Sequence, residues 1–230
     1  MIREASSTGK KHEGCISFSI YMPQKRQMEV VMKYLAIVGT NSDVSTNRML
    51  LQFMQKHFSN EAEIEVYEIK ELPAFMEPED SDVPEKVAEL SEKIWTADGV
   101  IIATPEYDHA IPAVLKSALE WISYTSQALT DKPVLIVGAS HGTLGSSRAQ
   151  AHLRQILDSP ELAARIMPSS EFLLGKSQGA FDGSGNLIYS DKVSELEEIF
   201  REFVLFTDIT SKLLKEKALI KKVKKYTWQE

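Results

Sequence analysis

The sequence is poor in cysteine and contains no long apolar run. Cys15 is the only cysteine among the 230 residues, so no disulfide can form within the chain, and a reducing, cytoplasmic location is expected. No stretch of about 18 or more apolar residues occurs, so we expect no membrane span. The net charge of −7 lacks the basic excess typical of nucleic-acid-binding surfaces, so no nucleic-acid partner is expected. Neither an H-x-x-x-H pattern nor a cysteine pair is present, and we therefore predict no metal site.

The composition is that of an ordinary globular domain. Hydrophobic residues make up 43% and charged residues 26% of the chain, and its length favours one domain, which we place at residues 32–214. Residues 1–31 show neither strand alternation nor a helical stripe, so we predict an N-terminal extension that is poorly ordered or not native. A sharper hypothesis makes Met32 the true start, because Met28 to Val30 permit a purine-rich codon string that resembles a bacterial ribosome-binding site.

The last segment, residues 215–230, is a basic tail. Between Lys215 and Lys225, six lysines and one glutamate surround a few apolar residues. A solvated helix end or a frayed tail is the simpler interpretation, and contact with a membrane surface or a partner is the alternative. We assign no function to this segment.

The body of the chain alternates strand-like and helix-like segments. Continuous apolar runs typical of strands buried on both faces occur at residues 34–38, 100–103, 134–137 and 172–174, and an alternating, edge-like strand at 64–69. Helical stripes of apolar residues fall at 50–58, 87–94, 114–122, after Gly145, and at 193–204. This alternation predicts an α/β fold of three layers, with a five-stranded parallel sheet of order 2-1-3-4-5 between helices and a ligand at the carboxyl ends of its strands.

The loop after the first strand is crowded with hydroxyl and amide side chains. It reads GTNSDVSTN from Gly39 to Asn47, and a helix is expected to follow. Free N–H groups and the helix dipole favour an anion there. Simple N-capping by Ser45 or Thr46 is the alternative, although capping requires one such residue and this loop offers six. The loop is neither G-x-G-x-x-G nor a P-loop, so a dinucleotide or ATP pyrophosphate is not the expected ligand.

Two further loops emerge at the same edge of the sheet. In the loop after the third strand, Pro105 restrains the chain and Tyr107 offers an aromatic edge or face. In the loop after the fourth strand, Gly142 and Gly145 permit close approach of the backbone to a ligand. A rigid connection and a flexible glycine loop without function are the alternatives. Because the three loops must lie together, we predict a site for a planar ligand that carries an anionic group.

The second of these loops and the helix after it resemble a known family. The run P-E-Y-D-H-A-I-P-A-V-L-K-S-A-L-E-W, residues 105–121, is similar to the signature P-E-Y-N/D-x-S/G-x-P-x-x-L-K-N-x-x-D/E-W of the NADPH-dependent FMN reductase family. This flavodoxin-like group includes azoreductases, quinone reductases and chromate-reducing flavoproteins, and the resemblance covers roughly residues 32–206. It implies a flavodoxin-like fold, FMN as cofactor, NADPH or NADH as electron donor, a small-molecule acceptor, and a homodimer or homotetramer.

The resemblance also implies a role for each loop. The FMN phosphate would be held by Thr40, Ser42, Ser45, Thr46 and Asn47. The ribityl chain and the isoalloxazine would be contacted by Pro105, Glu106, Tyr107 and Asp108, and the other edge of the ring by Ser140, His141, Gly142 and Gly145. Because FMN carries the chemistry, no side chain is nominated as a general base or a nucleophile. Two positions depart from the family pattern: many members have arginine in place of Ser42, and asparagine is more frequent than Asp108.

Three functions are compatible with these features. The leading one is an NAD(P)H-dependent reductase that transfers hydride to FMN and then reduces a flavin, quinone, azo compound or similar acceptor by ping-pong kinetics. The alternatives are a flavodoxin-type electron-transfer protein without direct NAD(P)H turnover and a flavin-bound regulatory or scaffold domain. The signature at residues 105–121 and the lack of a compact T-x-T-G-x-T phosphate loop favour the reductase. The acceptor and the choice between NADH and NADPH stay open.

Overall fold

A computed structural model describes residues 31–78 and 82–220, with side chains through residue 216. The predicted N-terminal extension, apart from its last residue, lies outside the described residues. The residues behind the hypothesis that Met32 is the true start, Met28 to Val30, also lie outside the described residues. The last ten residues of the predicted basic tail lie outside them as well.

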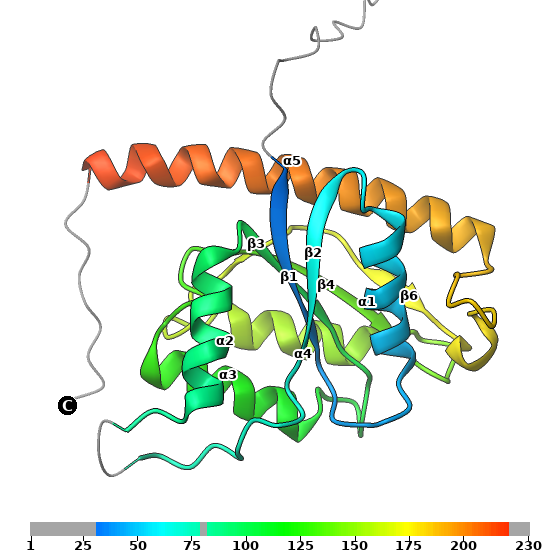
Figure 1. Ribbon diagram of the computed structural model, residues 1–230, viewed down its shortest axis with the longest axis horizontal. Helices are drawn as coiled ribbons and strands as arrows, with labels where there is room; N and C mark the ends of the chain where they lie inside the picture. Colours follow the sequence, from blue (N-terminus) through cyan, green and yellow to red (C-terminus); the bar gives the residue numbers. More distant parts are fainter. Residues whose placement is uncertain (1–30, 79–81, 221–230) are drawn as a thin grey trace, which may run out of the picture. The chain divides into compact units, whose positions relative to one another are not determined.

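A parallel β-sheet forms the centre of the described chain (Figure 1). Its order is β2 (Ala62–Glu68), β1 (Met32–Val38), β3 (Gly99–Ala103), β4 (Pro133–Ala139) and β5 (Arg165–Ile166), and a sixth strand, β6 (Phe172–Leu174), also pairs with β4. Every pairing is parallel. The predicted order 2-1-3-4-5 is confirmed, and the carboxyl ends of the strands share one edge.

The fifth position of the sheet is divided between two short strands. β5 pairs with the start of β4 and β6 with its end, so the predicted strand at residues 172–174 is present but fills only the second half of this position. Between the two strands the guanidinium of Arg154 donates to the carbonyl oxygens of Met167, at 3.0 Å, and Ser170. The side chain thus takes over backbone groups that a continuous strand would have paired with β4. A two-residue strand such as β5 is too short to leave a periodic signal in the sequence.

Helices cover both faces of the sheet. Because successive strand residues point to opposite faces, Tyr34 and Ala36 of β1 pack toward α1 (Thr46–His57) and α5 (Ser190–Ile220), while Leu35 packs toward the other layer. That layer consists of α2 (Glu85–Thr96), α3 (Ala113–Thr125) and α4 (Ser147–Leu157). A short 3₁₀ helix, η1 (Ser177–Gly179), precedes α5. Of the described helices, none combines the length and apolar character needed to cross a membrane. α5 continues six residues into the predicted basic tail.

Candidate functional site

A cavity of about 510 Å³ lies where the three irregular loops meet at the carboxyl edge of the sheet. Ten of the thirteen predicted site residues line it: Ser42, Ser45, Thr46, Asn47, Pro105, Glu106, Tyr107, Ser140, His141 and Gly142. Five further residues that the sequence interpretation did not single out also line it: Val44, Ala139, Thr143, Leu144 and Arg148. The prediction that loops after β1, β3 and β4 lie together therefore agrees with the geometry.

The first loop combines a helix cap with a hydroxyl-rich cavity wall. Ser45 is the N-cap of α1, and its Oγ accepts a hydrogen bond from the Arg48 N–H at 3.3 Å. The Thr46 and Ser177 hydroxyls lie 2.8 Å apart. The first N–H groups of a helix have no acceptor within it, and the helix dipole favours an anion at that end. Capping and anion binding are thus compatible here, because Ser45 satisfies one N–H group and the loop retains other donors.

Asn47 lines the cavity yet serves mainly as an internal brace. Only 2% of its surface is exposed. Its Nδ2 donates to the Ala139 carbonyl at 2.8 Å, and its Oδ1 accepts from the Ala139 N–H at 2.9 Å. The side chain therefore joins the start of α1 to the end of β4. The sequence indicated a polar residue in the first loop, but it gave no sign that both amide atoms would be used 92 residues away.

Three predicted site residues do not line the cavity. Thr40 is 1% exposed, and its Oγ1 accepts from the Ser42 N–H at 3.2 Å, which shapes the first loop from within. Asp108 and His109 have φ angles of 48° and 66° and form a tight two-residue turn. Asp and Asn tolerate such left-handed backbone better than most residues, so the asparagine-or-aspartate preference at 108 has a conformational cause.

The third residue outside the lining is Gly145. Its φ is +58°, and a Cβ there would lie 2.6 Å from the backbone carbon of Leu173, so this glycine permits the third loop to pack on β6. Gly142 is different, because the nearest atom to a Cβ would be the Ser140 Oγ at 4.0 Å. Of the two glycines, Gly142 is the one whose backbone adjoins open cavity.

Arg148, in the first turn of α4, is the main residue that sequence reasoning missed. Its N–H donates to Oε2 of Glu106 at 3.1 Å, and its Nη1 donates to Oε1 at 3.2 Å. Ser146, the N-cap of α4, makes no side-chain cap hydrogen bond, so Glu106 supplies the acceptor for this helix end from another loop. The sequence does contain a signal for this pair: Glu106 lies in the second loop and Arg148 just after the third, and both loops emerge at the same edge of the sheet.

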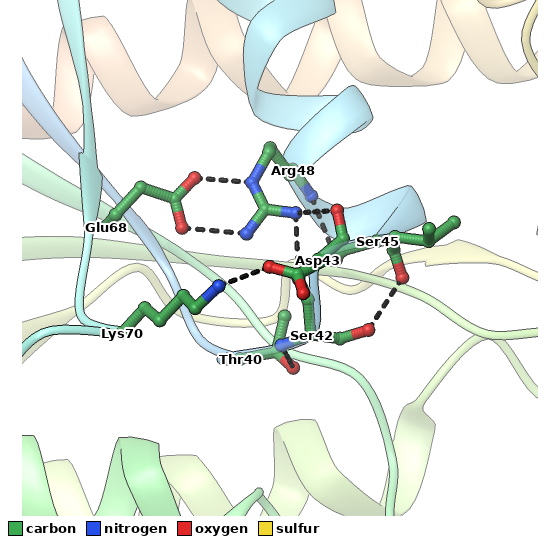
Figure 2. Close-up of polar contacts among 8 residues, drawn as sticks. Thr40, Ser42, Asp43, Ser45, Arg48, Glu68 and Lys70 are labelled. Atoms are coloured by element: carbon green, nitrogen blue, oxygen red, sulfur yellow. Dashed lines mark hydrogen bonds and ion pairs between the residues drawn. The ribbon is translucent and has the colours of Figure 1, made fainter.

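A second polar cluster lies behind the first loop (Figure 2). Arg48 donates through Nη1 to the carbonyl oxygens of Ser42, at 2.9 Å, and Asp43, at 3.0 Å, and its Nε and Nη2 face the two carboxylate oxygens of Glu68. Hydrogen bonding to Glu68 raises the pKa of Arg48. Lys70 pairs with Asp43 and lowers the pKa of that carboxyl group. Arg48 lines a neighbouring cleft rather than the cavity, so it stabilises the loop from outside.

We expect Arg48→Ala to weaken FMN binding by about tenfold, equivalent to about 1.4 kcal/mol, because the loop loses two charge-assisted contacts to its backbone. Titration of the apoprotein with FMN, followed by flavin fluorescence, measures the change. Lys70→Ala is the matched control, because its ion pair with Asp43 is exposed to solvent and such pairs contribute little. An unchanged Kd in Arg48→Ala would show that the loop keeps its shape without this side chain.

The sheet order and the cavity define the class of protein. This arrangement is that of flavodoxin-like flavoenzymes, and the solved structure of FerB, a flavoenzyme NAD(P)H:(acceptor) oxidoreductase from Paracoccus denitrificans, matches with a TM-score of 0.67 and 26% identity, covering 79% of this chain and 98% of its own. The family model described as NADPH-dependent FMN reductase matches residues 32–179. The chain belongs to the NADPH-dependent FMN reductase family.

Curated relatives agree with this assignment. The NADH:(hydroxy)cinnamate reductase subunit CrdA of Vibrio ruber is 77% identical over 198 residues, which cover 86% of this chain and 98% of the relative. The NADH-dependent flavin reductase subunit 2 of Lactobacillus johnsonii is 46% identical over 186 residues, covering 79% of this chain and all of the relative. The chain is accordingly an NAD(P)H-dependent oxidoreductase with FMN as its cofactor, and the predicted reductase class is confirmed.

The cavity residues suit FMN. A volume of about 510 Å³ lies within the range of about 300–1,000 Å³ typical of small-molecule sites. Hydroxyls and the start of α1 offer donors for a phosphate at one end, in place of the arginine that many members have at Ser42. Three exposed side chains with apolar surface, Val44, Tyr107 and Leu144, also line the cavity. This combination of polar groups and exposed apolar surface in one lining matches a ligand with a phosphate and a flat ring.

Proposed function

We propose that this chain oxidises NADH and reduces a small planar acceptor in two successive half-reactions at this cavity. The observation that carries the proposal is the apolar part of the cavity lining: Val44 is 89% exposed, and Tyr107 and Leu144 are each 49% exposed. Apolar side chains exposed around a polar cavity favour binding of flat, partly apolar molecules. NADH is proposed over NADPH because the relatives at 77% and 46% identity are both named for NADH.

FMN supplies the hydride-accepting and electron-donating chemistry when it is bound. The protein's own groups position the reactants. The predicted phosphate residues Ser42, Ser45 and Thr46 would hold one end of the cofactor, and Asn47 fixes the distance between the first and third loops. Ser140, His141 and Gly142 would border the ring. Donor and acceptor would use the same opening in turn, which gives ping-pong kinetics.

Anaerobic stopped-flow absorbance tests this proposal. The FMN-loaded protein, freed of excess FMN, is mixed first with NADH and then with an acceptor such as menadione. We expect rapid bleaching of the flavin band by NADH, recovery on mixing with the acceptor, and parallel lines in double-reciprocal plots of initial rates. Free FMN mixed with NADH is the control for uncatalysed reduction. Intersecting lines would contradict the two-step order.

The same experiment separates the alternative functions. A flavodoxin-type electron-transfer protein would retain FMN but show no useful rate of reduction by NADH or NADPH. A regulatory domain would be reduced but would reoxidise slowly whether or not an acceptor was present.

We also propose that the chain works as a homodimer or homotetramer in the cytoplasm. Support for self-assembly comes from the family resemblance; the names of the two relatives, both subunits, favour a further, different chain as an additional partner. Light scattering of the purified chain after size-exclusion chromatography measures its mass. A monomeric mass at micromolar concentration would contradict the self-assembly.

A further inference from the structure

One arginine, Arg148, is among the residues that line the cavity, and most of the N–H donors of its guanidinium make no hydrogen bond within the described residues. Arg148 lines the cavity, and 48% of its side chain is exposed. A guanidinium carries five N–H donors in a planar fork. Within the part of the chain that the structure describes, the only hydrogen bond of this guanidinium is the one from Nη1 to Glu106. The remaining edge of the fork is therefore free to receive a second anionic group.

Glu106 prepares Arg148 for such a group. The carboxylate of Glu106 is 13% exposed and accepts from both the backbone N–H and the guanidinium of Arg148. The bond from Nη1 restrains the guanidinium, the bond from the N–H holds Glu106 in place, and the side chain of Arg148 stays at the cavity surface. Arginine binds a carboxylate through two parallel N–H bonds, and a pre-oriented fork loses less entropy when it does so. The start of α4 adds a dipole of the sign that favours an anion.

The cavity lining therefore includes two places that favour anions. One is the hydroxyl-rich start of α1, after β1, and the other is Arg148 at the start of α4, after β4. The family resemblance implies that the first loop would hold the FMN phosphate. Arg148 is left for the molecule that shares the cavity with the flavin, and the exposed apolar side chains of Val44, Tyr107 and Leu144 in the lining favour a flat, partly apolar molecule.

From this arrangement we infer that Arg148 is a specificity-determining residue that binds the carboxylate of a flat, conjugated acceptor. The inference rests on the proposed function, because it names the acceptor class for the same cavity. It assigns no chemical step to Arg148: the side chain binds and orients the acceptor. Glu106 is its positioning residue.

The test compares two probes of similar shape, of which one is charged and the other neutral. Cinnamate is a flat conjugated carboxylate, and cinnamamide is its neutral analogue of similar shape. Each is titrated into the oxidised, FMN-loaded protein, and the Kd is read from the change in the flavin absorbance spectrum, so no turnover is needed. In Arg148→Ala we expect the Kd of cinnamate to rise by about 10- to 100-fold, as for loss of a charge-assisted bidentate contact, and that of cinnamamide to change by less than about twofold. Arg148→Lys should be intermediate, because it keeps the charge and loses the fork.

Two further variants control the result. Arg201→Ala removes an arginine of similar exposure, 59%, that pairs with Glu197 on α5, and it should leave both Kd values unchanged. Glu106→Gln removes the carboxylate that orients the guanidinium, so cinnamate binding should weaken by about threefold while cinnamamide binding stays unchanged; unchanged or tighter cinnamate binding would contradict the positioning role of Glu106. Thermal melting and FMN retention establish that each variant is folded.

Three outcomes would overturn the inference. Equal losses for both probes in Arg148→Ala would indicate general damage to the cavity, and no loss for either would place the carboxylate elsewhere. A selective rise in the KM of NADH, with cinnamate binding unchanged, would assign Arg148 to the phosphates of the donor. The proposed function is tested separately, because the probes are titrated in the absence of NADH and NADPH. It fails if neither donor reduces the FMN-loaded protein.

Discussion

Replacing Gly39 by alanine is expected to abolish tight FMN binding and to lower the free energy of unfolding by about 1–3 kcal/mol. Gly39 follows β1 directly and begins the first loop. A Cβ there would lie 2.5 Å from the carbonyl oxygen of Ala103 and 2.9 Å from Cδ2 of Leu115. The first of these neighbours is backbone, and Gly39 itself donates to it at 2.8 Å. The ends of β1 and β3 would have to separate, and with them two of the three loops around the cavity.

Thermal unfolding and FMN titration of the variant measure both effects. Gly179→Ala is the matched control, because no atom lies within 4 Å of a Cβ at that position. It should retain the melting temperature and the FMN affinity of the parent chain. A Gly39→Ala variant that also kept both would show that the strand ends tolerate the extra methyl group, and that the tight approach is incidental.

Sequence patterns predicted the sheet well because each strand of β1, β3 and β4 is buried on both faces and reads as a continuous apolar run. The same logic placed three loops at one edge, since parallel strands share their carboxyl ends. Sequence patterns did not predict β5, because a strand of two residues is too short to show a periodic pattern. Arg154 takes the place of the strand contacts that are missing after it.

Within the site, the sequence showed which positions are unusual more readily than the structural role of each residue there. Asp108 and Gly145 carried real signals, and in the structure each has a positive φ angle and lies outside the cavity lining. Arg148 was missed because its partner, Glu106, lies 42 residues earlier in the chain, and no local pattern records such a pair. Side-chain contacts between loops depend on tertiary structure. Sequence patterns can therefore place the loops at one edge of the sheet without showing which side chains of different loops pair.

Asn47 is the position where this distinction has the largest consequence. Asn47→Ala leaves the N–H and the C=O of Ala139 without their partner in the interior, and each such loss costs about 1–3 kcal/mol. We expect the free energy of unfolding to fall by about 2–4 kcal/mol and the melting temperature by about 5–15 °C. FMN affinity should fall as well, because the brace between the first and third loops is lost. Asn41→Ala, an exposed asparagine of the same loop, is the matched control and should change stability by less than about 0.5 kcal/mol.

Asn47→Asp distinguishes the brace from a direct contact with the FMN phosphate. An ionised carboxylate at this position can still accept from the Ala139 N–H but cannot donate to the Ala139 carbonyl, and its buried charge is unfavourable. The neutral acid can do both. Burial and the facing Ala139 carbonyl oppose ionisation more strongly than the start of α1 favours it, so we expect folding to raise the pKa of the introduced carboxyl group above its value in the unfolded chain. The variant should therefore be closest in stability to the parent below about pH 4 and should lose stability relative to it as the pH rises through the folded-state pKa. Urea unfolding of both apoproteins between about pH 4 and pH 8 measures this. A stability difference that is independent of pH would contradict the brace, since a side chain that only met the phosphate would have no such linkage in the absence of FMN.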